Sequence, residues 1–194
     1  VVWMGDFNYK CHTIGANEAV TMLEQGRRAE MFEKYDSLNK EKADTGIYYN
    51  FREPVPAPDF YPTYKKVEGR GNIPHDDDDP SWVRRVYVTE FKEPFYKGGR
   101  IVERVPGWCD RIQYHSLKHL RAQLVPGSRI AVGSDGLTKK ISTYRSINDV
   151  LTTSDHSPVC CTFRVKMPEE AAGAEAAGTR VRVMLRVLDI EAEE

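Results

Sequence analysis

The first ten residues, VVWMGDFNYK, constrain the fold more than any other stretch of the chain. Residues 1–4 predict the end of a strand, because β-branched and aromatic residues suit a pleated, half-buried surface. Gly5 then permits a turn that other residues resist. Asp6 and Asn8 follow at the mouth of the strand, where open α/β folds place their ligands. The two polar side chains either belong to a functional site or form an Asx-turn that only satisfies local backbone groups.

The rest of the chain carries helical patterns followed by strand patterns, which predict an α/β fold. Residues 17–38 have apolar side chains at helical spacing, and Gly26 divides them into two short amphipathic helices. Later stretches predict strands at residues 83–89, 111–115, 142–147 and 159–165. The acidic run HDDDDP at 75–80 predicts an exposed loop, because it lacks the ligand spacing and the glycine of a calcium loop.

The composition narrows the class of protein. With 194 residues, of which 40% are hydrophobic, the chain can bury one sizeable core. Its net charge of -1 argues against nucleic-acid binding by bulk electrostatics and leaves room for a local basic pocket. The four cysteines have neither a zinc-type nor a disulfide-type spacing, which favours a reducing cytosol. The sequence has no apolar run of the roughly 20 residues that a membrane span needs, so we expect any membrane contact to be peripheral.

Both ends of the sequence predict a piece of a larger arrangement. Val1 lies inside a predicted core strand without a lead-in loop, so we expect further sequence before it. Residues 168–180 are small, polar and charged, as in a linker, and residues 181–194 resemble a lone strand, which cannot stand by itself. We therefore expect one domain over 1–167 that is incomplete at its N-terminus, a linker over 168–180, and a further domain or tail from 181.

Three later clusters match the first in their density of ionisable side chains: PTYKK, VPGWCDRIQY and TTSDHSPVCCTF. Two of them abut a predicted strand, so we expect them to form loops at a sheet edge. Asp155 and His156 are the sharpest pair, because an imidazole needs an orienting acceptor before it can act as an acid, base or charge stabiliser. A single histidine is more often structural. Together with Asp6, Asn8 and Asp110, however, His156 indicates an active site.

The blocks GDFNYK, PTYKK, WCDRI and SDHSPV, in this order, resemble the signature blocks of the inositol polyphosphate 5-phosphatases, within the endonuclease/exonuclease/phosphatase superfamily. The resemblance runs from Val1 to about Val165, and four blocks coincide far less often by chance than one motif does. It implies a two-sheet α/β sandwich flanked by helices. It also implies Mg²⁺-dependent removal of the 5-phosphate from inositol phosphates or phosphoinositide lipids, in the cytoplasm or peripherally at a membrane, with no nucleic-acid partner. We expect the intact parent protein to carry this activity and the 194-residue chain alone to be inactive.

The resemblance implies roles for individual residues. Asp6 would activate or orient the attacking water, and Asn8 would hold that water and a phosphoryl oxygen. His156 would stabilise charge on the phosphoryl group, with Asp110 favoured over Asp155 as the carboxylate that fixes its tautomer. Asp155 would then lie near the metal and the leaving group, which makes it the expected Mg²⁺ ligand in this sequence.

Basic and aromatic residues are implied to hold the substrate, since charged donors suit a dianionic phosphate. Tyr64, Lys65 and Arg104 match the positions that grip the phosphate next to the scissile one. The full predicted set of substrate-binding residues is Lys10, Tyr64, Lys65, Arg104 and Arg111.

The sequence also departs from the family pattern. Lys10 stands where arginine is usual, and Val102 stands where a second phosphate-gripping lysine is common, so preference for a 4-phosphate stays open. The family's amino-terminal blocks, with the glutamate that ligates magnesium, do not occur. Two alternatives follow: a non-catalytic fragment or pseudophosphatase, and a nuclease or sphingomyelinase of the same superfamily. The second is not expected to carry PTYK and WCDR together.

Overall fold

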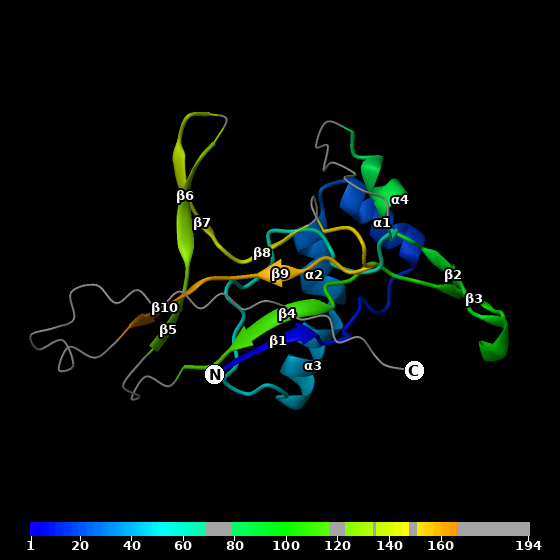
Figure 1. Ribbon diagram of the computed structural model, residues 1–194, viewed down its shortest axis with the longest axis horizontal. Helices are drawn as coiled ribbons and strands as arrows, with labels where there is room; N and C mark the ends of the chain where they lie inside the picture. Colours follow the sequence, from blue (N-terminus) through cyan, green and yellow to red (C-terminus); the bar gives the residue numbers. More distant parts are fainter. Residues whose placement is uncertain (69–78, 117–122, 134, 148–150, 167–194) are drawn as a thin grey trace, which may run out of the picture.

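A computed structural model describes residues 1–68, 79–116, 123–133, 135–147 and 151–166 (Figure 1). Its helices are α1 (Ala16–Glu24), α2 (Arg28–Tyr35), α3 (Ser37–Thr45) and α4 (Trp82–Val86), with a 3-10 turn η1 (Phe95–Lys97). Its strands are β1 (Val2–Asp6), β2 (Glu90–Lys92), β3 (Ile101–Glu103), β4 (Asp110–Tyr114), β5 (Gln123–Pro126), β6 (Ser128–Val132), β7 (Thr138–Ser142), β8 (Arg145–Ser146), β9 (Val159–Cys160) and β10 (Phe163–Lys166). The predicted linker, the predicted terminal strand and most of the acidic run lie outside the described residues.

The strands pair two by two and antiparallel: β1 with β4, β2 with β3, β5 with β10, β6 with β7, and β8 with β9. The β1–β4 pair lies at the centre of the molecule, and β4 also contacts β9. The hairpins β2–β3 and β6–β7 reach away from this centre in different directions (Figure 1). The centre therefore carries the core, and the two hairpins extend from it.

The helices form where the periodic pattern predicts them. α1 buries Val20 and Leu23, and α2 buries Met31 and Phe32. Gly26 separates the two helices with a positive φ of 70°, a backbone conformation that a side chain would disfavour. These residues belong to one hydrophobic core, which includes the fully buried Trp108. The expected pair of helices is confirmed, and α3 follows them.

Asp36 begins α3. Its side chain accepts a hydrogen bond from the backbone N–H of Asn39 at 2.9 Å, which is an N-terminal cap. Gly46, in the left-handed conformation, follows the last turn. The apolar periodicity ends at residue 38 and therefore does not predict α3, although these two helix-end signals lie on either side of it.

Of the strands predicted in the later stretches, the first is wrong, and two others are each divided into two shorter strands by non-strand residues. Residues 83–89 begin as the helix α4, because Trp82, Val83 and Val86 together bury one helical face. The strand predicted at 111–115 is confirmed as β4, whereas 142–147 is divided between the end of β7 and β8. The stretch 159–165 is interrupted because Thr162 turns its backbone towards Gly127 and the Thr143 hydroxyl, away from a ladder.

Two remaining features are the state of the cysteines and the membrane-spanning potential of the helices. All four cysteines are free thiols, and Cys160 is the half-buried one while the other three are buried. Within the described part of the chain, no helix is long and apolar enough to cross a bilayer.

Candidate active site

The four sequence blocks meet around the ends of β1 and β4. Backbone hydrogen bonds of 2.8–3.1 Å tie each block to another. These bonds join Phe7 to Cys109, Tyr64 to Gly107 in both directions, Ser157 to Thr63, and Lys66 to Asp155. Segments that are far apart in the sequence therefore surround one small region, as the expectation of sheet-edge loops requires.

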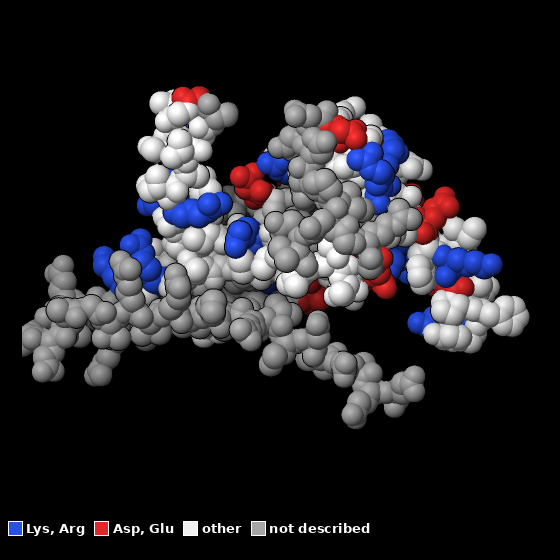
Figure 2. All heavy atoms as spheres, turned by 45° about the horizontal axis from the view of Figure 1, so that its top comes forward, with Lys and Arg blue, Asp and Glu red and all other residues white. Residues whose placement is uncertain are grey.

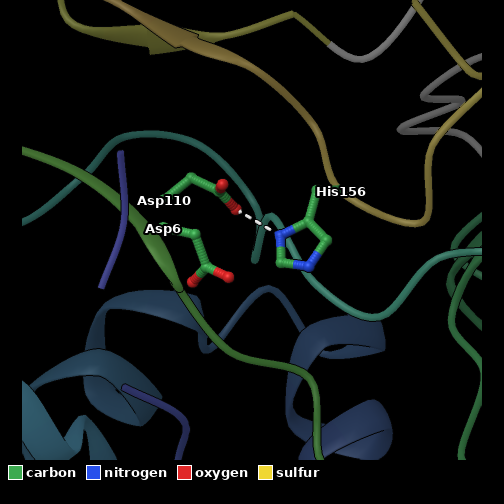
Figure 3. A group of neighbouring side chains, drawn as sticks. All are labelled: Asp6, Asp110 and His156. Atoms are coloured by element: carbon green, nitrogen blue, oxygen red, sulfur yellow. Dashed lines mark hydrogen bonds and ion pairs between the residues drawn. The ribbon is translucent and has the colours of Figure 1, made fainter. Parts of the chain in front are cut away.

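Asp6, Asp110 and His156 form the centre of this region (Figure 3). Asp6 ends β1 and Asp110 begins β4, and the antiparallel register places the two residues directly opposite each other. His156 comes from the loop before β9, and its Nδ1 lies 2.9 Å from Oδ2 of Asp110. One ligand atom of each residue lies within 4.8 Å of the others. The side chains of His156 and Asp110 are mostly shielded, at 26% and 15% exposed.

Electrostatics favour the protonated form of His156. Burial lowers the pKa of the imidazole, but the hydrogen bond and charge of Asp110, with the charges of Asp6 and Asp155, outweigh burial and raise it. Asp110 thus faces the Nδ1–H of the ring, which fixes how the ring is turned. The ring can then present its second N–H, on Nε2, to an anion.

Asp6 forms the Asx-turn that the sequence offers as an alternative to a functional role. The backbone N–H of Asn8 donates to Oδ1 of Asp6 at 2.7 Å, and Asn8 has a positive φ of 57°. Gly5 has a φ of 138°, which favours glycine, but it lies inside β1, so the turn predicted at this residue is wrong and the strand continues to Asp6. The Asx-turn alternative therefore describes the local geometry correctly. Because Asp6 also belongs to the cluster, the turn orients a carboxylate of that cluster.

The ring of Tyr64 packs against the imidazole of His156. The two ring centroids lie 4.6 Å apart, and Tyr64 is 9% exposed. The ammonium groups of Lys10 and Lys65 lie 5.1 Å and 5.6 Å from the centroid of the Tyr64 ring. Cations at this distance are attracted to the face of an aromatic ring. Three of the predicted substrate-binding residues are thereby brought next to the cluster.

Lys65 lies in a second arrangement that sequence reasoning missed. Its Nζ forms an ion pair of 2.6 Å with Oδ2 of Asp155 and lies 4.8 Å from the centroid of the Phe91 ring. Arg104 packs on the same ring, with its Cζ at 5.5 Å. Phe91 therefore contacts two of the predicted phosphate-binding cations. Because it belongs to none of the four blocks, nothing in the sequence marked it.

Arg111 corrects a prediction. Its side chain is 0% exposed, so it cannot reach a substrate. The guanidinium donates to Asp36 at 2.9 Å and forms an ion pair with Glu53. Burial disfavours its charge, but Glu53 and Asp36 outweigh burial and hold the pKa of Arg111 above its ordinary value. Arg111 is a structural residue that ties the α2–α3 junction and the loop before residue 60 to β4.

Among the described residues, the group that can hold a cation is Asp6, Asp110 and His156. Mg²⁺ prefers oxygen ligands and takes one or two carboxylates together with waters and substrate phosphates. The two carboxylates of the cluster fit this demand. Asp155, the metal ligand expected from the sequence, stands outside the group and pairs with Lys65.

Comparison with known proteins identifies the family. Residues 1–162 match the family described as Endonuclease/Exonuclease/phosphatase family 2, which covers most of the chain. The chain belongs to this family.

Three curated relatives bear names that agree with it. The chain is 29% identical over 168 residues to type II inositol polyphosphate 5-phosphatase 15 of Arabidopsis thaliana, covering 86% of the chain. It is 30% identical over 165 residues to phosphatidylinositol 3,4,5-trisphosphate 5-phosphatase 1 of Xenopus laevis, covering 84%. It is 35% identical over 128 residues to inositol-1,4,5-trisphosphate 5-phosphatase 1 of Schizosaccharomyces pombe, covering 66%. The chain spans only 12%, 12% and 9% of these relatives.

A solved structure supports the same fold. The crystal structure of Cimex nitrophorin in its ferrous NO complex superposes with a TM-score of 0.53 at 22% identity, covering 86% of this chain and 41% of that one. At this identity the likeness concerns the fold alone. With the family match, it confirms the predicted α/β fold of the endonuclease/exonuclease/phosphatase type.

Proposed function

We propose that this chain contributes the reaction centre of a phosphoric monoester hydrolase that removes the 5-phosphate from inositol polyphosphates or phosphoinositide lipids. One observation carries the proposal: Asp6, Asp110 and His156 converge in a family whose relatives are named for this reaction. The surrounding cations suit its substrate, because Lys10, Lys65 and Arg104 can neutralise several phosphate charges.

The roles of Asp6 and Asn8 follow from their turn. The carboxylate of Asp6 is held by the Asn8 N–H at one oxygen and can accept a proton from, or orient, the attacking water with the other. The exposed amide of Asn8 can hold the same water and a phosphoryl oxygen. The Asp6 carboxylate lies in one cluster with the imidazole, so the water and the stabilised charge would meet at one place.

The role of His156 follows from its protonation. A protonated Nε2 can donate to a phosphoryl oxygen as charge accumulates there, while Asp110 holds Nδ1. Bound Mg²⁺ supplies Lewis-acid stabilisation of the phosphoryl oxygens. The carboxylates of Asp6 and Asp110 would hold it, and we propose Asp155 as a further ligand once a substrate phosphate competes for Lys65.

The test is phosphate release by the intact parent protein from inositol 1,4,5-trisphosphate and from phosphatidylinositol 3,4,5-trisphosphate in vesicles. We expect loss of the 5-phosphate in the presence of Mg²⁺ and none after chelation by EDTA. The position of the lost phosphate is read by chromatography of the products. Cleavage of a phosphodiester substrate instead would favour the nuclease or sphingomyelinase alternative, and no phosphate release with Mg²⁺ would favour the non-catalytic one.

Lys65→Ala is expected to raise KM for substrates that carry a phosphate next to the scissile one. A charge-assisted contact is worth about 1.5–3 kcal/mol, which corresponds to a rise of roughly tenfold or more. For a substrate without that neighbouring phosphate we expect a clearly smaller change. Lys139→Ala, on the exposed strand β7, is the matched control and should leave both values unchanged. Equal effects of Lys65→Ala on both substrates would show that Lys65 does not recognise the neighbouring phosphate.

A further inference from the structure

We infer that the tip of the β2–β3 hairpin, residues 94–101, docks onto an anionic lipid surface. The hairpin extends away from the core (Figure 1). Its tip exposes large apolar side chains to an extent unusual for a folded protein: Phe95 is 96% exposed, Tyr96 82% and Ile101 70%. None of the three takes part in the core. A group of apolar side chains at the end of an extended element indicates an interaction site.

The charges of the tip point to the chemistry of the partner. Lys97 and Arg100 are its charged residues, and both are exposed and positive. The Lys97 ammonium lies 5.9 Å from the centroid of the Tyr96 ring, so cationic and aromatic groups are adjacent. Figure 2 shows mostly uncharged surface at the end of the hairpin, with both basic and acidic side chains next to it. Aromatic rings at the headgroup level and cations that attract anionic lipids are the two elements of peripheral membrane binding.

The size of the tip favours a bilayer over a protein partner. A stable protein interface buries about 800 Å² on each side and involves some 20 residues or more. The tip consists of eight positions, of which three are glycine or proline at 94, 98 and 99. A short element with two aromatic rings and one isoleucine is too small for such an interface, but it is large enough to enter the headgroup region of a membrane.

The base of the hairpin connects the tip to the reaction centre. Glu103, on β3, accepts a hydrogen bond from the Ala16 N–H at the start of α1 at 2.7 Å, which holds the hairpin against the body. Phe91, on β2, contacts Lys65 and Arg104. Docking of the tip would thus bring these cations to the level of lipid headgroups. This orienting effect rests on the proposed function, whereas lipid binding by the tip does not.

Lipid binding is tested by co-sedimentation with vesicles of phosphatidylcholine alone or mixed with phosphatidylserine. We expect the unmodified protein to bind the mixed vesicles. Phe95→Ser combined with Tyr96→Ser should weaken this binding about tenfold or more, because the buried aromatic area is lost. Lys97→Glu combined with Arg100→Glu should weaken it by a similar factor and abolish the preference for phosphatidylserine.

Matched controls come from the other extended hairpin. Ile130→Ser with Val132→Ser removes apolar side chains that are 69% and 70% exposed, and Lys139→Glu with Lys140→Glu makes the same change of charge. Both controls should bind vesicles as the unmodified protein does. The inference is overturned if the unmodified protein does not bind mixed vesicles; the tip would then be a candidate site for a protein partner. It is also overturned if the control variants lose as much binding as the tip variants.

A second readout separates this inference from the proposed function. In the intact parent protein, Phe95→Ser with Tyr96→Ser should leave the hydrolysis of soluble inositol 1,4,5-trisphosphate unchanged while it lowers the hydrolysis of the lipid substrate in vesicles. Vesicle binding without any hydrolysis would contradict the proposed function and leave the docking site in place. Equal loss on the soluble and the lipid substrate would mean that the tip acts on the reaction centre and would overturn the docking role.

Discussion

His156→Ala lowers kcat for release of the 5-phosphate by about a hundredfold or more, which is the loss typical of removing one preorganised electrostatic donor. The variant should fold normally, because the imidazole lies in the cluster at the ends of β1 and β4 and outside the hydrophobic core. Steady-state kinetics measure the loss, and circular dichroism checks the fold. Turnover near that of the unmodified protein would remove His156 from the reaction.

Asp110→Asn separates the orienting role from a merely structural one. Asp110 raises the pKa of His156, so its loss should lower that pKa. Because the protonated imidazole is the active form in this proposal, activity falls as the pH rises through the pKa of His156. The alkaline limb of the kcat profile should therefore move to lower pH in Asp110→Asn. A lower kcat with an unmoved limb would show that Asp110 does not act through His156.

Arg111→Ala lowers the free energy of unfolding by about 3–5 kcal/mol, the range for breaking a buried ion pair. The substitution leaves Asp36 without its cation at a position that is 0% exposed, and Glu53 loses its ion-pair partner and keeps the hydrogen bond from Gln113. Urea denaturation followed by fluorescence measures the change. Arg129→Ala, on the exposed strand β6, is the control and should stay within about 0.5 kcal/mol of the unmodified protein.

The triple substitution Arg111→Met with Asp36→Asn and Glu53→Gln refines this test. It removes all three charges, so no charge is left buried without a partner. The loss should be smaller than that of Arg111→Ala alone. A loss as large as or larger than that of the single variant would show that the packing of Arg111 against Phe32, at 4.9 Å from the ring centroid, matters more than its ion pairs.

The sequence predicts those features that local patterns encode. Apolar spacing located α1 and α2, Gly26 located the break between them, and the β-rich start located β1. The blocks around Asp6, Asp110 and His156 identified residues that the structure brings together. These successes share one cause, because periodicity and turn residues act over a few positions.

Long-range contacts explain what the sequence left out. In the sequence, Arg111 cannot be distinguished from a substrate-binding arginine of a basic motif. Its burial depends on ion pairs with Asp36 and Glu53, which come from distant segments. The stretch around Val83 has the β-branched residues of a strand, but the core selects its helical face. Lys65 and Phe91 meet across elements as well, and no spacing rule links position 65 with position 91.

Activity should depend on the correct register between β1 and β4. Asp6 faces Asp110 and Gly5 faces Arg111 in the present alignment. Because side chains alternate between the two faces of a strand, a slip by one residue would bring Asp6 opposite Arg111 and turn one of each pair to the wrong face. A chain mispaired in this way could keep most of its secondary structure and still be inert. Loss of turnover would then report a sheet assembled one step out of place before any spectroscopic signal of unfolding does.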